Sequence, residues 1–268
     1  MGYDLHVHST YSDGTLTPAE VLDRAIAKGL KGIAITDHDN VDGIAETLAE
    51  ARKRNFQVIP GVEITTDFGE YEAHILGYNF DWQHPRLLQK LEQIVASRVR
   101  RAQSMIEKLN RHHVPVTWEQ VLKFSNGRFV GRPHIFKAME AIGYVDSQHR
   151  NSVFDYYLGQ NGVAYIPHQE IETKEAIELI LDAGGIPVLA HPGRVGADHL
   201  IEQFAGWGLR GIEVYYPSHM QELIDRLLIV AEKLQLYVTG GSDFHGRLGQ
   251  AELGDAQVSE LPWVLSGK

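Results

Sequence analysis

The chain has 268 residues, of which 43% are hydrophobic and 22% charged, and its formal net charge is −10. These values are ordinary for one large globular domain, with or without an insertion. The absence of cysteine excludes disulfides and thiolate metal sites, so any metal ion must be held by nitrogen and oxygen ligands. No stretch is long and apolar enough to span a membrane, and the first residues do not resemble a signal peptide. We therefore expect a cytoplasmic protein with no membrane partner.

The first 80 residues alternate between strand and helix patterns. Thr17 is suited to cap a helix, Pro18 to its first position and Gly29 to its end. The pattern predicts strands at 3–7, 31–36, 57–66 and 71–80, and helices at 16–30 and 40–55. Repeated strand–helix units predict a parallel sheet with helices packed outside it.

The middle of the chain contains only helical patterns. A long helix is expected at 85–113, with shorter ones at 117–125, 132–143 and 152–160. Residues 83–172 hold 12 Lys and Arg against 8 Asp and Glu, whereas the rest of the chain holds 13 against 27. We predict that this mildly basic segment is a helical insertion, able to lie over the site as a lid and to attract an anion.

Strand–helix alternation returns after the insertion. Helices are expected at 173–185, 198–208 and 218–235, and strands at 186–191, 209–216 and 236–245. The total of about seven strands indicates a closed or nearly closed barrel, formed by residues 1–82 together with 173–268. In such barrels, functional residues gather where strands end and loops begin.

Histidine, aspartate or glutamate recurs where most of the predicted strands end. Alternate residues of a strand share a face, so His6 lies beside His8, and Asp243 beside His245. If the strands are parallel, their carboxyl ends meet at one rim. One histidine after an apolar run is usually no ligand, but donors from six segments predict a metal site. The candidates are His6, His8, Asp37, His38, Glu63, His74, His191, Asp243 and His245.

Six segments carry a resemblance to a known family. They are DLHVHSTYSDG (4–14), ITDHD (35–39), GVEI (61–64), HILGY (74–78), AHPGR (190–194) and GSDFH (241–245). Together they resemble the motifs of the PHP (polymerase and histidinol phosphatase) family. The resemblance implies an α/β fold, a distorted (β/α)7 TIM-like barrel. It also implies two or three divalent metal ions at the carboxyl rim, and phosphoester hydrolysis.

The resemblance further implies a set of metal ligands. One ion is expected on His6, His8, Glu63 and Asp243, a second on Glu63, His74 and His191, and a third on Asp13, His38 and His245. Many relatives have histidine where this chain has Asp13, and a carboxylate there favours a hard ion. Mn²⁺ is our first choice, with Mg²⁺, Fe²⁺ and Zn²⁺ as alternatives. We expect Asp37 to orient a ligand histidine, and Asp39 to cap a helix or close a turn.

Hydrolysis of a phosphoester needs a strong nucleophile and neutralisation of phosphoryl charge. A water bridging two ions supplies the first, so His6, His8, Glu63 and Asp243 are expected to be catalytic through the ions they hold. Arg194 follows AHPG and is expected to bind phosphate at the rim, and thereby to take part in catalysis. The GRPH segment at 131–134 is similar to a motif in the insertion of one PHP branch. That similarity implies that Arg132 and His134 contact the substrate phosphate.

The other histidines and two tyrosines receive plainer interpretations. His219 either faces the site or caps the next helix, and Tyr215 and Tyr216 are expected to pack. The remaining histidines are expected on helices or loops away from the rim: His84, His112, His113, His149, His168 and His199.

The PHP branch with a helical insertion resembles enzymes that act on nucleotides. We predict removal of the 3′-phosphate from nucleoside 3′,5′-bisphosphates, leaving a nucleoside 5′-monophosphate. The close alternative is a 5′→3′ exonuclease acting on short RNA or DNA. Histidinol-phosphate phosphatase and a non-catalytic, metal-binding regulatory module are further alternatives. The modest positive charge of residues 83–172 favours a small anionic nucleotide over long nucleic acid, and no obligate protein partner is expected.

Overall fold

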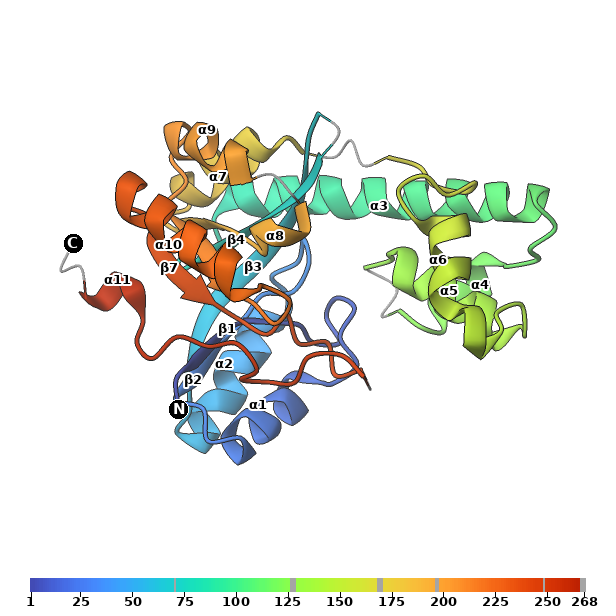
Figure 1. Cartoon of the computed structure of the whole chain (residues 1–268). Helices are drawn as coiled ribbons and strands as arrows, with labels where there is room; N and C mark the ends of the chain where they lie inside the picture. Colours follow the sequence, from blue (N-terminus) through green and yellow to red (C-terminus); the bar gives the residue numbers. More distant parts are fainter. Residues whose placement is uncertain (70, 126–128, 168–170, 196–197, 248, 266–268) are drawn as a thin grey trace.

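The computed structural model describes residues 1–69, 71–125, 129–167, 171–195, 198–247 and 249–265. Seven strands form one sheet in which each strand lies beside its neighbours in chain order (Figure 1). They are β1 (Tyr3–Val7), β2 (Gly32–Ile35), β3 (Gln57–Phe68), β4 (Tyr71–Tyr78), β5 (Ile186–Leu189), β6 (Gly211–Tyr215) and β7 (Tyr237–Gly240).

The sheet is parallel except at β4, which runs antiparallel to both β3 and β5. The expectation of a fully parallel sheet is therefore wrong at this strand. Only two residues separate Phe68 from Tyr71, whereas a parallel connection needs about a dozen residues. Reversal brings the first half of β4 to the carboxyl rim, where His74 pairs with Thr65. His74 thus reaches the rim without lying at the carboxyl end of its strand.

The sheet nearly closes into a barrel between its first and last strands. A parallel bridge joins Val7 to Phe244, and the His8 N–H donates to the Phe244 carbonyl at 2.9 Å. Gly241 permits this approach, because a Cβ on it would lie 2.3 Å from the Cβ of His6. The predicted distorted seven-stranded barrel is confirmed.

Helices cover the barrel, and local sequence explains their ends. The Thr17 and Glu20 side chains form a capping box at the start of α1, where Pro18 takes the first position. α2 ends at Asn55, which adopts the left-handed conformation. The helices outside residues 83–172 are α1 (Pro18–Ala27), α2 (Gly43–Arg54), α7 (Thr173–Asp182), α8 (Pro192–Val195), α9 (Ile201–Gly206), α10 (Gln221–Leu234) and α11 (Pro262–Leu265).

The middle of the chain forms a helical block beside the barrel. It contains α3 (Pro85–Arg111), α4 (Trp118–Leu122), α5 (Arg132–Ala141) and α6 (Arg150–Leu158). Figure 1 shows α3 running from the barrel to the other three helices. Leu87 and Ile94 of α3 belong to the barrel core, whereas Met105 and Leu109 belong to a separate core with α4, α5 and α6. Because α3 serves both cores, the domain boundary at residue 83 stays a prediction.

Within the described part of the chain, no helix is long and apolar enough to cross a bilayer. The cytoplasmic location stays a prediction.

Candidate metal centre

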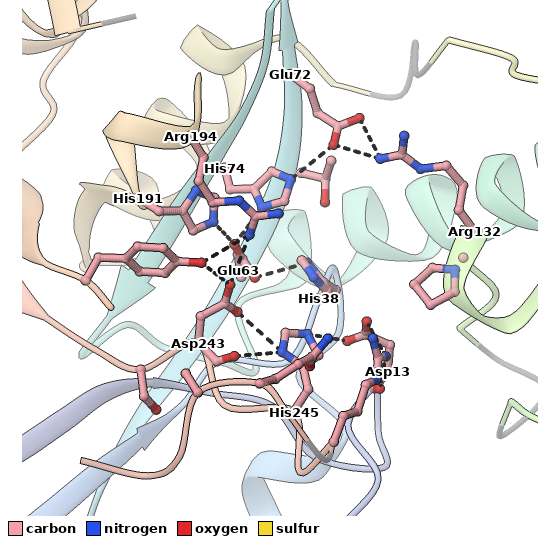
Figure 2. Close-up of a pocket in the computed structure, with 18 of the residues that line it drawn as sticks. Asp13, His38, Glu63, Glu72, His74, Arg132, His191, Arg194, Asp243 and His245 are labelled. Atoms are coloured by element: carbon pink, nitrogen blue, oxygen red, sulfur yellow. Dashed lines mark hydrogen bonds and ion pairs between the residues drawn. The ribbon is translucent and has the colours of Figure 1, made fainter. Parts of the chain in front are cut away.

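A cavity of about 510 Å³ lies between the carboxyl rim of the barrel and the helical block. Barrel residues such as Glu63 and Asp243 line one side, and Phe129 and Arg132 line the other. Figure 2 shows the histidine and carboxylate side chains converging on this space from separate strands and loops.

One group of candidate ligands consists of His6, His8, Glu63 and Asp243. Each offers an atom within 4.8 Å of the others. The His8 Nε2 atom lies 3.1 Å from both Glu63 Oε2 and Asp243 Oδ1. The His6 Nε2 atom lies 3.2 Å from Glu63 Oε2. The structure thus brings together the four residues expected to hold the first ion.

A second group contains Asp13, His38 and His245, as expected for the third ion, and adds His8. The His245 Nε2 atom lies 3.0 Å from Asp13 Oδ1. The His8 and His245 rings stack with their centroids 4.2 Å apart. His8 therefore belongs to two groups and lies between them.

The third group differs in composition from the expected second ion site. It contains His38, Glu63 and His74, with His74 Nδ1 2.6 Å from Glu63 Oε1. His191 lies close by, with its Nε2 atom 3.2 Å from the same oxygen. Glu63 thus directs one oxygen to His74 and His191, and the other to His6, His8 and His38. A carboxylate used in this way can bridge two ions.

The protonation of the cluster fits its role as a cation site. Burial alone would raise the pKa of Glu63, but the charges of His38, His6 and His74 hold it well below its usual range. The pKa of Asp243 is lowered in the same way, against burial, by neighbouring histidines. Burial would lower the pKa of His8, yet Asp243 and Glu63 raise it to about 10, so in the absence of metal this imidazole holds a proton that a divalent ion must displace. The carboxylates stay ionised, as oxygen ligands of a divalent ion must be.

Several buried atoms of the cluster are left without ordinary partners. Among the described residues, six nitrogen or oxygen atoms of candidate ligand residues have no hydrogen-bond partner: His6 Nε2, His8 Nε2, Asp13 Oδ1, His38 Nδ1, Glu63 Oε2 and His191 Nδ1. Unsatisfied buried polar groups are costly, so a cluster of them indicates a missing ligand. The nitrogen and carboxylate donors fit divalent metal ions.

A second layer of carboxylates holds the ligands in place. Glu213 on β6 is fully buried and accepts hydrogen bonds from His6 Nδ1 at 3.1 Å and the His191 N–H at 2.8 Å. Asp37 accepts from the Ser9 and Ser12 hydroxyls, and Ser12 Oγ lies 3.4 Å from His8 Nδ1. Asp37 therefore acts on the loop that carries the candidate ligands, and among the described residues it forms no hydrogen bond with a candidate ligand histidine.

The predicted phosphate-binding arginines lie on opposite sides of the cavity (Figure 2). Arg132, at the start of α5, pairs with Glu72 at 3.1 Å, and Glu72 lies 3.6 Å from His74 Nε2. Arg194 lies 3.2 Å from Asp243 Oδ2. Each cation is thus held beside the candidate metal ligands by a carboxylate.

His134 lies behind the cavity wall. Its side chain is 2% exposed, and its Nδ1 atom accepts from the Gly131 N–H at 3.1 Å. Gly131, Arg132 and Pro133 line the cavity in front of it. A phosphate contact by His134 stays a prediction.

The chain is similar to known proteins in both sequence and structure. A family model described as the PHP domain matches residues 4–96. A 5′-3′ exoribonuclease of Haemophilus influenzae is 35% identical over 257 residues, which is 94% of this chain and 93% of that protein. The chain belongs to the PHP family. A 3′,5′-nucleoside bisphosphate phosphatase of Chromobacterium violaceum is 35% identical over 248 residues, 90% of this chain and 86% of that protein.

Solved structures agree with the PHP assignment. A metal-dependent phosphoesterase structure from Bifidobacterium adolescentis has a TM-score of 0.89 at 32% identity, covering 97% of this chain and 93% of that one. An amidohydrolase structure from Chromobacterium violaceum, with bound sulfate and no metal, has a TM-score of 0.87 at 33% identity. It covers 96% of this chain and 92% of the other. The PHP fold and the donor cluster together support divalent metal ions as cofactors.

Three residues of this PHP chain differ, in whole or in part, from what the sequence led us to expect. Asp39 lies in a turn, which was one of its two expected roles, but it does not cap α2: its side chain accepts from the Thr65 N–H at 2.9 Å and pairs with Arg98. Tyr216 lines the cavity and donates to Asp243 Oδ2 at 3.0 Å, so it is more than a packing residue. His219 accepts from the Gly193 N–H at 3.2 Å, and so braces α8, the short helix that carries Arg194.

Other residues that line the cavity of this PHP chain were not predicted from the sequence. Arg247 lines the cavity and its Nη2 atom lies 3.0 Å from Asp13 Oδ2. Arg98 and Arg101 reach the same cavity from α3. A periodicity signal existed for this pair, since both lie on the buried face of an amphipathic helix. His168 lies outside the described residues. Among the described residues, none of the other histidines assigned to helices or loops lines this cavity: His84, His112, His113, His149 and His199.

Proposed function

We propose that this PHP chain removes the 3′-phosphate from nucleoside 3′,5′-bisphosphates and releases a nucleoside 5′-monophosphate. The observation that carries the proposal is the shared cavity, where seven of the nine candidate ligands line the wall together with arginines on both sides. Its volume of about 510 Å³ lies within the ~300–1,000 Å³ range of small-ligand sites.

The metal ions are proposed on the three ligand groups. One ion would lie on His6, His8, Glu63 and Asp243, and the others on the groups that share His38. Bound divalent ions neutralise phosphoryl charge and lower the pKa of water at neutral pH. Mn²⁺ is the proposed ion, since the Asp13 carboxylate favours a hard cation, and Mg²⁺, Fe²⁺ and Zn²⁺ are alternatives.

The arginines of the cavity would bind and orient the two phosphates. Arg194 lies beside Asp243, so it would contact the phosphate that reacts. Arg132 lies farther out, beside Glu72, and would contact the phosphate that is retained. Arginine offers a planar fork that matches two phosphate oxygens. Two cations on separate sides suit a substrate with two phosphates.

A 5′→3′ exonuclease acting on short oligonucleotides is the second candidate. Relatives named 5′-3′ exoribonuclease include the Haemophilus influenzae protein and one from Salmonella typhimurium that is 34% identical over 259 residues. The same metal ligands would serve either reaction. The two differ in whether the cavity accepts one nucleotide or the end of a strand.

The proposal is tested by measuring kcat/KM with Mn²⁺ on both substrate classes. We expect 3′,5′-bisphosphoadenosine to be the better substrate, with 5′-AMP and phosphate as products resolved by chromatography. Short RNA carrying a 5′-phosphate is the competing substrate. A higher kcat/KM on RNA would transfer the assignment to the exonuclease. Asp243→Asn should abolish both activities while the fold is retained, and full activity of that variant would refute metal-dependent catalysis.

A further inference from the structure

Arg98 lies where the helical block meets the barrel, and it faces the barrel. It belongs to α3, between Ile94 of the barrel core and Ala102 of the second core. Its side chain is only 7% exposed. A buried arginine is uncommon unless it is paired, so the contacts of this one decide its role.

The guanidinium of Arg98 joins three different segments of the chain. It forms an ion pair with Asp39, whose side chain is fully buried. Its Nη2 atom donates to Thr65 Oγ1 on β3 at 2.6 Å. Its central carbon lies 4.9 Å from the centre of the Phe129 ring in the helical block. One side chain thus connects α3, the loop after β2, β3 and the segment before α5.

The partner Asp39 lies in a strained turn directly after the candidate ligand His38. Its φ angle is +46°, which is uncommon for a residue other than glycine. Its N–H donates to the Glu63 carbonyl at 2.8 Å, and its Oδ1 accepts from the Thr65 N–H at 2.9 Å. Arg98 neutralises the carboxylate that holds this turn. This turn places His38 beside Glu63, with His38 Nδ1 3.1 Å from Glu63 Oε2.

The ring of His38 is also supported through Phe129. The two rings stack with an interplanar angle of 7° and centroids 5.8 Å apart. Arg98 lies against Phe129 as well. The backbone of His38 and its ring are therefore both held by groups that Arg98 touches.

We propose that Arg98 is a positioning residue that fixes His38 for metal binding, and that α3 thereby couples the helical block to the metal centre. His38 belongs to two of the three ligand groups, whereas the group of His6, His8, Glu63 and Asp243 does not contain it. Loss of Arg98 should weaken the binding of the ions that depend on His38. It should leave unchanged the binding of the ion on the group that lacks His38. This inference rests on the proposed metal-dependent function.

The experiment measures Mn²⁺ binding to purified, metal-free protein by calorimetry, with ion counting after gel filtration. Arg98→Met removes the charge and keeps most of the apolar stem. We expect it to bind at least one ion fewer at a concentration that saturates the wild type. Outer residues that orient ligands typically contribute about 10–100-fold in affinity, and we expect a weakening of that order here. Arg100→Met is the matched control, because Arg100 is exposed on the same helix.

Two further variants separate positioning from folding. Arg98→Lys keeps the ion pair but lacks the planar fork, so it should recover part of the lost affinity. Arg98→Met combined with Asp39→Asn leaves no unpaired buried carboxylate, and should fold even if Arg98→Met does not. We expect this double variant to melt near the wild-type temperature and still bind the His38-dependent ions weakly.

The outcomes distinguish this inference from the proposed function. Wild-type stoichiometry and affinity in a folded Arg98→Met protein, or in the double variant, would overturn the role of Arg98. An equal loss of every ion would also overturn it, because the effect would not be specific to His38. Failure of the wild type to bind any Mn²⁺ would instead count against the proposed function.

Discussion

The carboxylate of Glu213 gives the most direct test of how the proposed metal ligands are held. It is fully buried on β6, and both of its oxygens accept hydrogen bonds. The donors are His6 Nδ1 at 3.1 Å and the His191 N–H at 2.8 Å. Glu213→Gln changes one oxygen to an NH2 group of similar size. That group cannot accept from either donor, so one of the two hydrogen bonds must be lost.

The expected magnitude follows from these contacts. A buried donor left without its acceptor costs about 1–3 kcal/mol. Orienting partners of metal-binding histidines contribute about 10–100-fold in metal affinity, a matching amount, since tenfold corresponds to about 1.4 kcal/mol. We therefore expect Glu213→Gln to weaken Mn²⁺ binding by about 10–100-fold. Calorimetric titration measures the affinity, and thermal unfolding of the metal-free protein measures the cost to the fold.

The control is Glu222→Gln, since Glu222 is exposed on α10. It should bind Mn²⁺ as the wild type does. If Glu213→Gln retains wild-type affinity while its fold is intact, the hydrogen bonds to His6 and His191 do not determine metal binding, and the reasoning is refuted.

Three further predictions concern other parts of the cavity. Burial lowers the pKa of His134 from 6.5 to about 4. Between pH 6.5 and pH 4, the unfolded chain therefore binds more protons at this residue than the folded chain does. Lowering the pH from 6.5 to 4 should reduce the free energy of unfolding by about 3 kcal/mol through His134. Chemical unfolding at several pH values should therefore show a flatter dependence in His134→Gln, and equal slopes would contradict this. Glu72→Gln releases Arg132 from a partly exposed ion pair that contributes about 0.2–1 kcal/mol. The freed arginine should bind phosphate more readily, so KM for the bisphosphate should fall by up to about fivefold. A rise in KM would show instead that Glu72 assists substrate binding. Asp13→His replaces an oxygen ligand with nitrogen, so competitive metal analysis should show a preference moving from Mn²⁺ toward Zn²⁺, and an unchanged preference would exclude Asp13 as a ligand.

The cluster of candidate ligands could be predicted from the sequence because strand patterns and side-chain chemistry are both local. A strand followed by His-x-His places two nitrogens on one face, as at His6 and His8. The order of strands was also predictable, because sequential strands are usually neighbours in a sheet. The fold class could therefore be inferred without coordinates.

The direction of β4 could have been inferred and was not. Histidine near the end of an apolar run fits a parallel strand equally well, so His74 gave no warning. The signal was the connection, since two residues between Phe68 and Tyr71 cannot carry a parallel crossover. His74 was therefore predicted at the correct rim, but from the wrong strand direction.

The residues that support the ligands were harder to predict, because their partners are distant in sequence. Glu213 contacts His6, 207 residues away. A glutamate within an apolar strand signals a buried polar role but does not name its partner. Arg98 poses the same difficulty. Its place on the apolar face of α3 predicts that it is buried, but it does not predict that Asp39 is its ion-pair partner.

The continuity of α3 bears on how the cavity is closed. A lid that swings on a hinge needs a segment that absorbs a change of backbone angles. The first part of α3 packs in the barrel core and the last part packs with α4, α5 and α6, and the helix is unbroken over 27 residues. Arg98 adds a buried ion pair to Asp39 at the junction. Swinging the helical block about α3 would bend that helix or expose this pair, at a cost of several kcal/mol. We therefore expect the wall formed by α3 and α5 to be fixed, so that the distance from Arg132 to the metal ligands selects the substrate.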